Sequence, residues 1–326
     1  MEKSSSSYHF MLSLILSFID CAFYNPNEEN EFLDWMRYFN DFYNEGDYKF
    51  RFGIWMTNCR YIKEHNRGNN NYMLGLNKFI IYTPAEYQAL LGLKPHVKPN
   101  LMSTRTKFEG HANLDYRKKG VVNDIKDQSS CGSCWAFSAI QAVESAYALK
   151  TGNLISLSEQ NLIDCVRKCH GCNGGEIGCA YDYIIEKQDG YFNKGSDYPY
   201  TGHEMNCAYE PSKGVCHISS YIYAVQGDES DLQAKIAQYG PASVGIDASH
   251  LSFQLYSNGI YDEKKCLSTS INHGVGCVGY GTENNEKYWI VRNSWGKSWG
   301  ENGYIRMTRG KENQCGIATL AVIPIL

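Results

Sequence analysis

The 326-residue sequence has no apolar stretch long enough to cross a lipid bilayer. Its longest candidate, Phe10–Ile19, is well short of the roughly 20 residues that a spanning helix needs. It has no Asn-x-Ser/Thr acceptor, so we expect no N-linked glycan. Basic residues are not in excess, with 31 Lys and Arg against 35 Asp and Glu, which argues against nucleic-acid binding. Internal repeats and low-complexity tracts are also lacking, and the length suits one large or two ordinary globular domains.

Cysteine, by contrast, is abundant. The 13 cysteines are typical of a protein from an oxidising compartment, and the odd number leaves at least one thiol unpaired within a monomer. Residues 1–22 read as a signal peptide, because Lys3 precedes an apolar run of the right length; the cleavage site is poor, and a buried N-terminal helix is the alternative. We therefore predict a protein that is secreted or resides in a lysosome-like compartment.

A polar linker, Lys94–Asn113, divides the chain into two parts. The first part is mainly helical, and one predicted helix face carries an apolar and polar stripe, in which the polar members are expected to form specific hydrogen bonds. The stripe consists of Arg51, Trp55, Asn58, Ile62 and Asn66. A break at Gly68–Asn71 precedes a short extended piece, Leu74–Phe79, and a helix after Pro84.

The second part changes from helix to strand along the chain. We predict helices over Cys134–Thr151, Leu157–Cys165 (capped by Ser156 or Ser158) and Ile177–Lys187. From Ile218 onward the patterns are those of strands: ISSYIYAV, ASVGIDA, GVGCVGYG, KYWIVRNSW, GYIRMT and TLAVIPI. This segregation predicts an α+β fold.

The pair Cys131 and Cys134, in QSSCGSCWAFSA, admits three interpretations. A zinc site could use it together with Cys165, Cys169, His170 and Cys172, but these candidates are scattered where structural zinc sites use compact pairs. A redox dithiol would sit near a βαβ pattern, which is absent from the sequence. The third interpretation makes Cys131 structural and Cys134 a nucleophile.

Residues further along the chain favour a nucleophile. Cys134 begins a predicted helix, whose dipole favours a thiolate. A nucleophilic cysteine needs a base and a group that orients the base. His273, in a Gly-rich strand, and Asn293, just before Ser294-Trp295, could supply them. Each alone could be an ordinary hydrogen-bonded core residue; the three together point to catalysis.

Taken together, these features resemble the papain family of cysteine proteases, in its cathepsin L-like branch. The motifs that carry the resemblance are QSSCGSCWAFSA, SLSEQNLIDC, GCNGG, NHGVGCVGYG and RNSWGKSWGENGYIR, in this order. It implies an endopeptidase in which Cys134 attacks the scissile carbonyl to form a thioester, His273 exchanges protons and Asn293 orients His273. Gln128 and the Cys134 backbone N–H would bind the oxyanion.

The resemblance also implies a fold, a substrate cleft and a disulfide pattern. The peptidase would span residues 110–326 as two lobes, a helical lobe at about 119–220 and a β-barrel-like lobe at about 221–318. Substrate would bind along Gly174, Gly175, Ile177, Gly245, Ile271, Asn272, Gly274, Trp295 and Leu320. Disulfides would join Cys131 to Cys172, Cys165 to Cys207 and Cys266 to Cys315. Cys277 would be a buried free thiol, and Cys169, Cys179 and Cys216 remain without assigned partners.

Residues 23–109 would then be a mainly helical inhibitory propeptide that blocks the cleft. Its stripe and the GLNKF segment (Gly75–Phe79) resemble propeptide motifs, with cleavage between Leu101 and Asn113. We expect protein or peptide substrates, the chain's own propeptide and possible cystatin-like inhibitors as partners of a monomer, with no metal, cofactor, nucleic acid or membrane span. The alternative is a catalytically inactive homologue that acts as a binding protein, against which the intact Gln128, Cys134, His273 and Asn293 speak.

Overall fold

The computed structural model describes residues 26–95, 104–108, 110 and 112–326. The predicted signal peptide, 1–22, lies outside the described residues, as does part of the predicted cleavage window. The helices of eight or more residues are α2 (Pro26–Phe39), α3 (Glu45–Arg67), α5 (Cys134–Thr151), α7 (Ile177–Lys187) and α8 (Glu229–Tyr239); shorter ones are α4 (Pro84–Leu90), α6 (Glu159–Cys165) and α9 (Leu251–Gln254). The strands are β1 (Tyr72–Leu74), β2 (Leu114–Asp115), β3 (Tyr191–Phe192), β4 (Cys216–His217), β5 (Ser220–Tyr223), β6 (Ala242–Ile246), β7 (Tyr256–Tyr261), β8 (His273–Glu283), β9 (Glu286–Arg292), β10 (Tyr304–Thr308) and β11 (Ala321–Ile325).

The chain divides into two units, residues up to Tyr61 and residues from Ile62 onward. The described part of the first unit contains α2 and most of α3, held together by aromatic side chains. Phe32 lies at the centre, with its ring centroid 5.8 Å from that of Trp35 and 5.7 Å from that of Trp55. Trp55 is fully buried, so this member of the predicted stripe is a core residue.

The second unit begins with the end of α3 and a short strand. Asn66 on α3 pairs with the backbone of Leu74 through two hydrogen bonds, of 2.8 and 2.9 Å, as expected for a polar residue of the stripe. The predicted extended piece Leu74–Phe79 is wrong in extent: β1 ends at Leu74 and a turn follows. The side chain of Asn77 accepts a hydrogen bond from the Phe79 N–H at 2.9 Å, which favours the turn over a strand.

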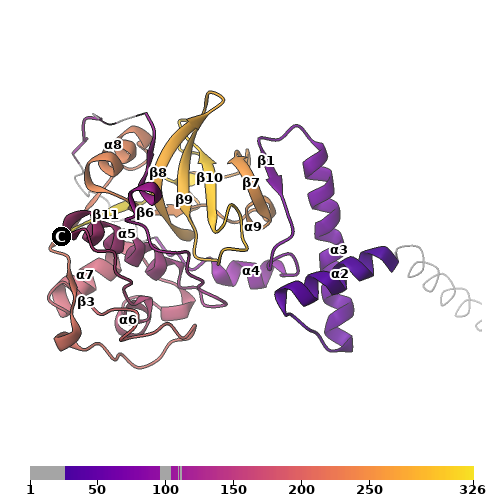
Figure 1. The fold of residues 1–326 in the computed structure, drawn as a ribbon, viewed down its shortest axis with the longest axis horizontal. Helices are drawn as coiled ribbons and strands as arrows, with labels where there is room; N and C mark the ends of the chain where they lie inside the picture. Colours follow the sequence, from indigo (N-terminus) through magenta and orange to yellow (C-terminus); the bar gives the residue numbers. More distant parts are fainter. Residues whose placement is uncertain (1–25, 96–103, 109, 111) are drawn as a thin grey trace, which may run out of the picture. The chain divides into compact units, whose positions relative to one another are not determined.

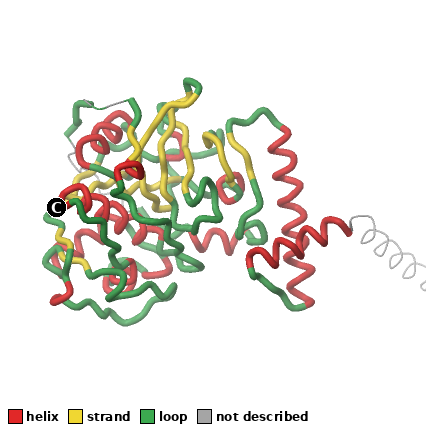
Figure 2. The backbone as a smooth tube through the Cα atoms, viewed as in Figure 1, coloured by secondary structure: helices red, strands yellow, loops and turns green. Residues whose placement is uncertain are grey.

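A mostly antiparallel sheet forms one side of this unit (Figures 1 and 2). Among the described residues its strand order is β1-β7-β10-β9-β8-β6-β11-β5, and β2 pairs with the far part of β8. The long strand β8 lies between β6 and β9, with His273 paired to Ile246 at its first residue. The sequence patterns located β5, β6, β8, β9, β10 and β11, whereas α8 and β7 were not predicted. β11 extends the sheet past residue 318, the predicted end of the β lobe.

Three helices, α5, α6 and α7, form the other side; α5 and α7 begin at the predicted residues, whereas α6 begins at Glu159 rather than at the predicted Leu157. The Ser158 side chain accepts a hydrogen bond from the Asn161 N–H, so Ser158 rather than Ser156 caps α6. Glu176 caps α7, accepting from the N–H groups of Gly178 and Cys179. The separation of helices from sheet confirms the predicted α+β class. Among the described residues no helix is long and apolar enough to cross a membrane.

Helix α5 packs directly on β8, and this contact requires a glycine. A Cβ atom added at Gly276 would lie 2.3 Å from the side-chain carbon Cδ of Gln141, a fully packed residue of α5. Only a residue without a side chain therefore allows the helix this close to the strand.

We predict that Gly276→Ala lowers the free energy of unfolding by about 1–3 kcal/mol, because the helix or the Gln141 side chain must shift. Urea unfolding of the precursor, in a protein that also carries Cys134→Ala, measures this change in the free energy of unfolding. Gly53→Ala is the matched control, because a Cβ there meets nothing within 4 Å. In mid-helix this change should be neutral or stabilising by about 0.5–1 kcal/mol. Equal stability of the two variants would contradict the packing argument.

Candidate active site

Cys134 is the first residue of α5 and is fully buried. Its Sγ accepts a hydrogen bond from the backbone N–H of Gly274, at 3.4 Å, so the helix terminus meets the start of β8. The cap residue Ser133 makes no side-chain hydrogen bond to the helix, which leaves the first turn without a side-chain cap. The thiol therefore lies where α5 and the sheet converge, beside the predicted base.

His273 begins β8 and Asn293 directly follows the neighbouring strand β9, and their side chains are hydrogen-bonded to each other. His273 Nε2 lies 2.8 Å from Asn293 Oδ1, which also accepts a hydrogen bond from the Ser294 N–H at 2.8 Å. An amide oxygen can only accept, so this pair assigns the imidazole proton to Nε2. Nδ1, which has no hydrogen-bond partner among the described residues, is then the basic nitrogen. A base on β8 is thus oriented by an amide just beyond β9.

Trp295 covers the His273–Asn293 pair. Its ring centroid lies 4.7 Å from that of His273, and the side chain is fully buried. Phe253 and Trp299 pack against the same indole, at 5.7 and 5.2 Å. Such aromatic contacts contribute about 0.5–1.5 kcal/mol each beyond the area they bury, and here they exclude water from the hydrogen bond.

Gln128 lies at the same site but its amide is occupied. Its Nε2 donates to the carbonyl oxygens of Leu90, at 3.0 Å, and Cys131, at 2.8 Å. Its Oε1 accepts from Ser294 Oγ at 2.7 Å, which fixes the direction of the amide. A side-chain amide held in this way is preorganised to donate to a carbonyl oxygen, and in this structure that oxygen belongs to Leu90.

The residues Leu90–Lys94, which we call the crossing segment, run over Cys134. A Cβ atom at Gly92 would lie 1.7 Å from the Gly132 carbonyl oxygen, so the backbone passes in direct contact. Gly175 exchanges two hydrogen bonds of 2.8 Å with this segment, its N–H donating to the Gly92 carbonyl and its carbonyl accepting from the Lys94 N–H. On the opposite side the Leu93 N–H donates to the carbonyl of Asn272 at 3.0 Å. The segment is therefore bound by backbone groups on both walls.

Leu93 places its side chain in an apolar pocket between the two lobes. It is only 3 % exposed and belongs to the same buried cluster as Ile177 and Ile271. A Cβ atom at Gly245 would meet Leu93 Cδ2 at 2.7 Å, so the glycine makes room for this side chain. Leu320, partly buried, packs against the cluster, and its carbonyl accepts from the Gly245 N–H at 2.8 Å. Four of the expected substrate residues, Ile177, Gly245, Ile271 and Leu320, thus belong to the packing around Leu93.

Burial under the crossing segment favours the neutral forms of both reactive groups. It raises the pKa of the Cys134 thiol to about 11, against hydrogen bonds from the backbone at Gly274, Gly92, Trp135 and Leu93 that lower it. It lowers the pKa of His273 to about 4, although the hydrogen bond to Asn293 acts the other way. At neutral pH the covered site therefore holds a thiol and a neutral imidazole rather than an ion pair.

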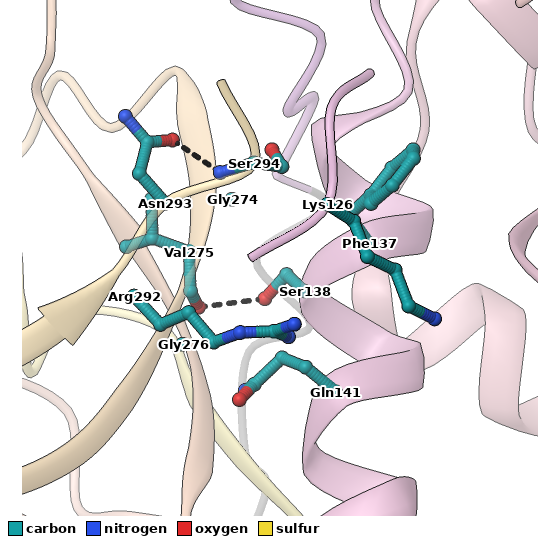
Figure 3. Close-up of a pocket in the computed structure, with 10 residues that line it drawn as sticks. All are labelled: Lys126, Phe137, Ser138, Gln141, Gly274, Val275, Gly276, Arg292, Asn293 and Ser294. Carbon is teal, nitrogen blue, oxygen red and sulfur yellow. Dashed lines mark hydrogen bonds between the residues drawn. The ribbon is translucent and has the colours of Figure 1, made fainter. Parts of the chain in front are cut away.

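The contact between α5 and the strands β8 and β9, next to the thiol, is closely packed. A small cavity of about 10 Å³ lies between α5 and the ends of β8 and β9 (Figure 3). Ser138 of α5 donates to the Val275 carbonyl at 2.8 Å beside it, next to Asn293 and Ser294. This side-chain bond ties the helix to the strand one turn below Cys134, so the thiol and the histidine are held by two joined elements.

The cysteines decide between the interpretations of Cys131 and Cys134. Disulfides join Cys131 to Cys172, Cys165 to Cys207 and Cys266 to Cys315, which are the pairs the resemblance implied. Because Cys131, Cys165 and Cys172 are thus used, neither the zinc site nor the Cys131–Cys134 redox dithiol is present. Cys134 and Cys277 are free and buried.

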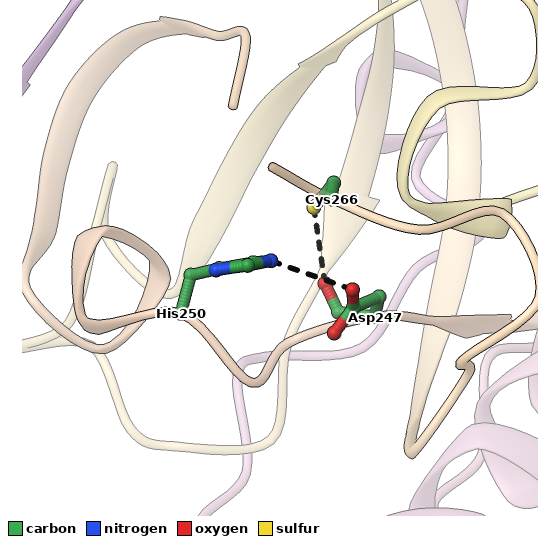
Figure 4. A group of neighbouring side chains, drawn as sticks. All are labelled: Asp247, His250 and Cys266. Carbon is green, nitrogen blue, oxygen red and sulfur yellow. Dashed lines mark hydrogen bonds and ion pairs between the residues drawn. The ribbon is translucent and has the colours of Figure 1, made fainter. Parts of the chain in front are cut away.

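One group of side chains resembles a metal site elsewhere in the sheet-rich lobe. Asp247, His250 and Cys266 come together (Figure 4), with His250 Nε2 3.4 Å from the Asp247 carboxylate. The Cys266 sulfur is bonded to Cys315 and is not a thiolate. Asp247 Oδ2 already accepts from the Leu267 N–H at 2.9 Å, so the carboxylate organises this loop.

The sequence did not reveal the roles of Ser294 and of the crossing segment. Ser294 lies between two predicted site residues, yet only the fold shows that its hydroxyl orients Gln128. Leu90, Gly92 and Leu93 fall at the end of α4 and the edge of the predicted linker, where no periodicity marks them. Their signal would be a Gly between apolar residues directly before the polar linker begins at Lys94.

Comparisons with known proteins find similar sequences and a similar fold over nearly the whole chain. Residues 111–325 match the model of the papain family cysteine proteases, and residues 32–87 that of the cathepsin propeptide inhibitor domain. The chain is 42 % identical to cysteine proteinase 3 of Dictyostelium discoideum, covering 100 % of both chains. It is 38 % identical to human cathepsin L2, covering 92 % of this chain and 93 % of that one. The structure of digestive procathepsin L 3 from the larval midgut of Tenebrio molitor superposes with a TM-score of 0.85 at 36 % identity, covering 93 % of this chain and 100 % of that one.

We predict that Cys134 in the precursor is alkylated slowly by iodoacetamide at neutral pH, because a thiol with a pKa of about 11 is almost wholly protonated there. The rate should rise as the pH increases toward that pKa. Peptide mapping by mass spectrometry follows Cys134 separately from the other free cysteines. A rate that is already maximal at pH 7 would contradict the direction of the pKa shift.

Proposed function

The chain belongs to the papain family of cysteine proteases and carries a cathepsin-type inhibitory propeptide, and from this we propose that it is an endopeptidase acting through Cys134, His273, Asn293 and Gln128. It is a cysteine peptidase, a hydrolase, made as a precursor. We assign the propeptide to residues 23–109 and the peptidase to residues 110–326; the ranges that match the two family models fall within these bounds.

The observation that supports the proposal most is the convergence of three elements on one buried point. Cys134 begins α5, His273 begins β8, and Asn293 is the residue directly after β9. Cys134 Sγ lies 3.4 Å from the Gly274 nitrogen, and His273 Nε2 lies 2.8 Å from Asn293 Oδ1. A nucleophile, a base and a group that orients the base are the parts that acyl transfer through a covalent intermediate requires.

In the proposed reaction, displacement of the crossing segment exposes the pair to solvent and frees the Gln128 amide. The Cys134 proton passes to His273 Nδ1, and the thiolate attacks the substrate carbonyl carbon. Gln128 Nε2 and the Cys134 N–H donate to the oxyanion, a contribution of about 3–4 kcal/mol per donor in comparable sites. The imidazolium then protonates the leaving amine as the C–N bond breaks.

Water completes the cycle. His273 removes a proton from the water molecule that attacks the thioester carbonyl, the C–S bond breaks, and the thiol and the carboxylic acid product are released. Asn293 keeps the imidazole in the tautomer that presents Nδ1 throughout, and Trp295 protects that bond. Substrate would follow the walls that now bind the crossing segment, along Gly174, Gly175 and Asn272.

The pocket that holds Leu93 is the proposed specificity pocket. Ile177, Gly245, Ile271, Gly274 and Leu320 provide apolar walls and space, with no carboxylate among them. Transfer of an apolar side chain into such a pocket contributes about 1.5–3 kcal/mol, whereas an unpaired arginine would lose its hydration without a partner. We therefore expect preference for Leu, Phe or Val two residues before the cleaved bond. A monomer, inhibition by cystatin-like proteins and a secreted or lysosome-like location remain predictions.

Changing Cys134 to Ala should abolish peptidase activity and leave the purified precursor unprocessed, because no other residue at the site can form the thioester. Activity on a peptide substrate and the mass of the protein after incubation at acid pH measure both effects. Cys277→Ala, another buried free cysteine, is the control and should keep its activity. Normal maturation of the purified Cys134→Ala protein would rule out self-processing.

Gly92→Ala should weaken the inhibition by the propeptide, because its Cβ would meet the Gly132 carbonyl at 1.7 Å and lift the crossing segment from Cys134. We expect alkylation of Cys134 in the precursor, or maturation, to be at least about tenfold faster, the effect of losing roughly 1.4 kcal/mol of contact. Gly53→Ala in the same propeptide should leave both rates unchanged. Unaltered rates in Gly92→Ala would show that the segment does not guard the thiol.

Leu320→Glu should place a carboxylate in the proposed specificity pocket and raise cleavage of substrates with Arg in place of Phe at that position. The ratio of kcat/KM for Phe-Arg and Arg-Arg dipeptide substrates, in wild type and variant, tests this. Leu320→Gln, of the same shape but neutral, separates charge from size. A wild-type enzyme that cleaves both substrates equally well would overturn the pocket assignment.

A further inference from the structure

Two cysteines that the catalytic machinery does not use lie in contact at the start of α7. Cys169 precedes the GCNGG loop and Cys179 is in the first turn of the helix, and their Sγ atoms are 3.1 Å apart. A disulfide bond measures about 2.05 Å, so the sulfurs are about 1 Å from bonding distance. Both thiols are free in the structure.

The local backbone holds these two thiols together. The Glu176 N–H donates to Cys169 Sγ at 3.4 Å, and the Glu176 carboxylate accepts from the Cys179 N–H at 2.8 Å. One capping residue thus bonds to both cysteines, one through its backbone and one through its side chain. The contact is therefore fixed by the fold and does not depend on a flexible side chain.

The two thiols differ in their exposure and in the direction of their pKa shifts. Cys169 is buried and Cys179 is half-buried, and both line a cavity of about 660 Å³ whose walls include Lys168 and Lys187. The hydrogen bond from Cys169 lowers the pKa of Cys179, and the same bond raises the pKa of Cys169. Because Cys179 is the more exposed of the two, it is the thiol that a small reagent can reach.

We propose that Cys169 and Cys179 form a fourth disulfide, made by exchange with a low-molecular-weight disulfide such as oxidised glutathione. The Cys179 thiolate attacks one sulfur of the small disulfide and displaces one thiolate. Cys169 then loses its proton to solvent and attacks the Cys179 sulfur, displacing the second thiolate. Two protein thiols are oxidised and one small disulfide is reduced to two thiols.

This bridge would support the backbone that binds the crossing segment. A Cβ atom on Gly175 would lie 2.9 Å from the Cβ of Cys169, so Cys169 lies directly behind Gly175. Gly175 carries the two backbone hydrogen bonds to Gly92 and Lys94. The disulfide closes a short loop that contains Gly174 and Gly175, and it therefore restrains one wall of the cleft; that this wall also binds substrate rests on the proposed function.

The test uses the full precursor with Cys134→Ala, so that neither peptidase activity nor the reactive thiol enters the result. The protein is incubated with oxidised glutathione, free thiols are blocked at acid pH, and disulfide-linked peptides are identified by mass spectrometry. We expect a peptide that links Cys169 to Cys179. Adding Cys216→Ser, at a buried free cysteine in β4, should leave this link intact, whereas adding Cys179→Ser should remove it. Both cysteines recovered as free thiols, or a stable glutathione adduct on Cys179, would overturn the proposal.

Hydrogen exchange tests the restraint independently of any enzyme assay. In the oxidised precursor the amides of residues 170–176 should exchange roughly tenfold more slowly than in the Cys179→Ser variant, because the bridge limits local opening of the loop. The Cys216→Ser variant should match the parent. A linked Cys169–Cys179 pair with unchanged exchange would overturn the claim that the bridge restrains Gly174 and Gly175. An inactive mature enzyme would refute the proposed function and leave both measurements valid.

Discussion

The burial of a helix N-terminus against the first residues of a strand is the constraint on which the rest of this structure depends. Cys134 begins α5, and its thiol accepts a hydrogen bond from Gly274 at the start of β8. That contact places the proposed nucleophile beside His273 and fixes the distance between the helical and sheet-rich lobes. Ser138, with a hydroxyl that reaches the Val275 carbonyl, and Gly276, with no side chain against Gln141, keep α5 close to β8 over the next two turns. The reactive geometry is therefore a consequence of how two secondary-structure elements pack.

The same burial accounts for the inactive precursor that the proposed function requires. With the crossing segment in place the thiol and the imidazole are both desolvated, so neither carries the charge that the proposed reaction needs. Backbone hydrogen bonds at Gly175 and Asn272 contribute about 1 kcal/mol each, and the buried Leu93 adds an apolar contribution. Inhibition thus uses contacts that would equally suit a substrate, with Gly92 keeping the backbone in direct contact with Gly132.

The cysteines of this chain have three different roles. Three disulfides fasten loops of the two lobes, Cys134 is placed for chemistry, and buried thiols such as Cys277 fill the core. Cys169 and Cys179 differ from the other free thiols, because their sulfurs lie in contact but unbonded behind the wall that contacts the propeptide. Their position links the redox state of the surroundings to the stiffness of one side of the cleft.

The sequence alone determined the fold class and the presence of the propeptide, and it supplied the residues to which the proposed reaction assigns roles. Helical and alternating patterns separate α5, α6 and α7 from the strands, because periodicity reports which face of an element is buried. The motifs around Cys134, His273 and Asn293 could be recognised because each lies in a local context of glycine and tryptophan. Only the tertiary structure decided that β1 ends at Leu74, that Ser294 orients Gln128 and that Leu93 fills the apolar pocket. It also brought Cys169 to Cys179. These features depend on contacts between residues far apart in the chain or on the path of a turn, and neither leaves a period or a spacing in the sequence.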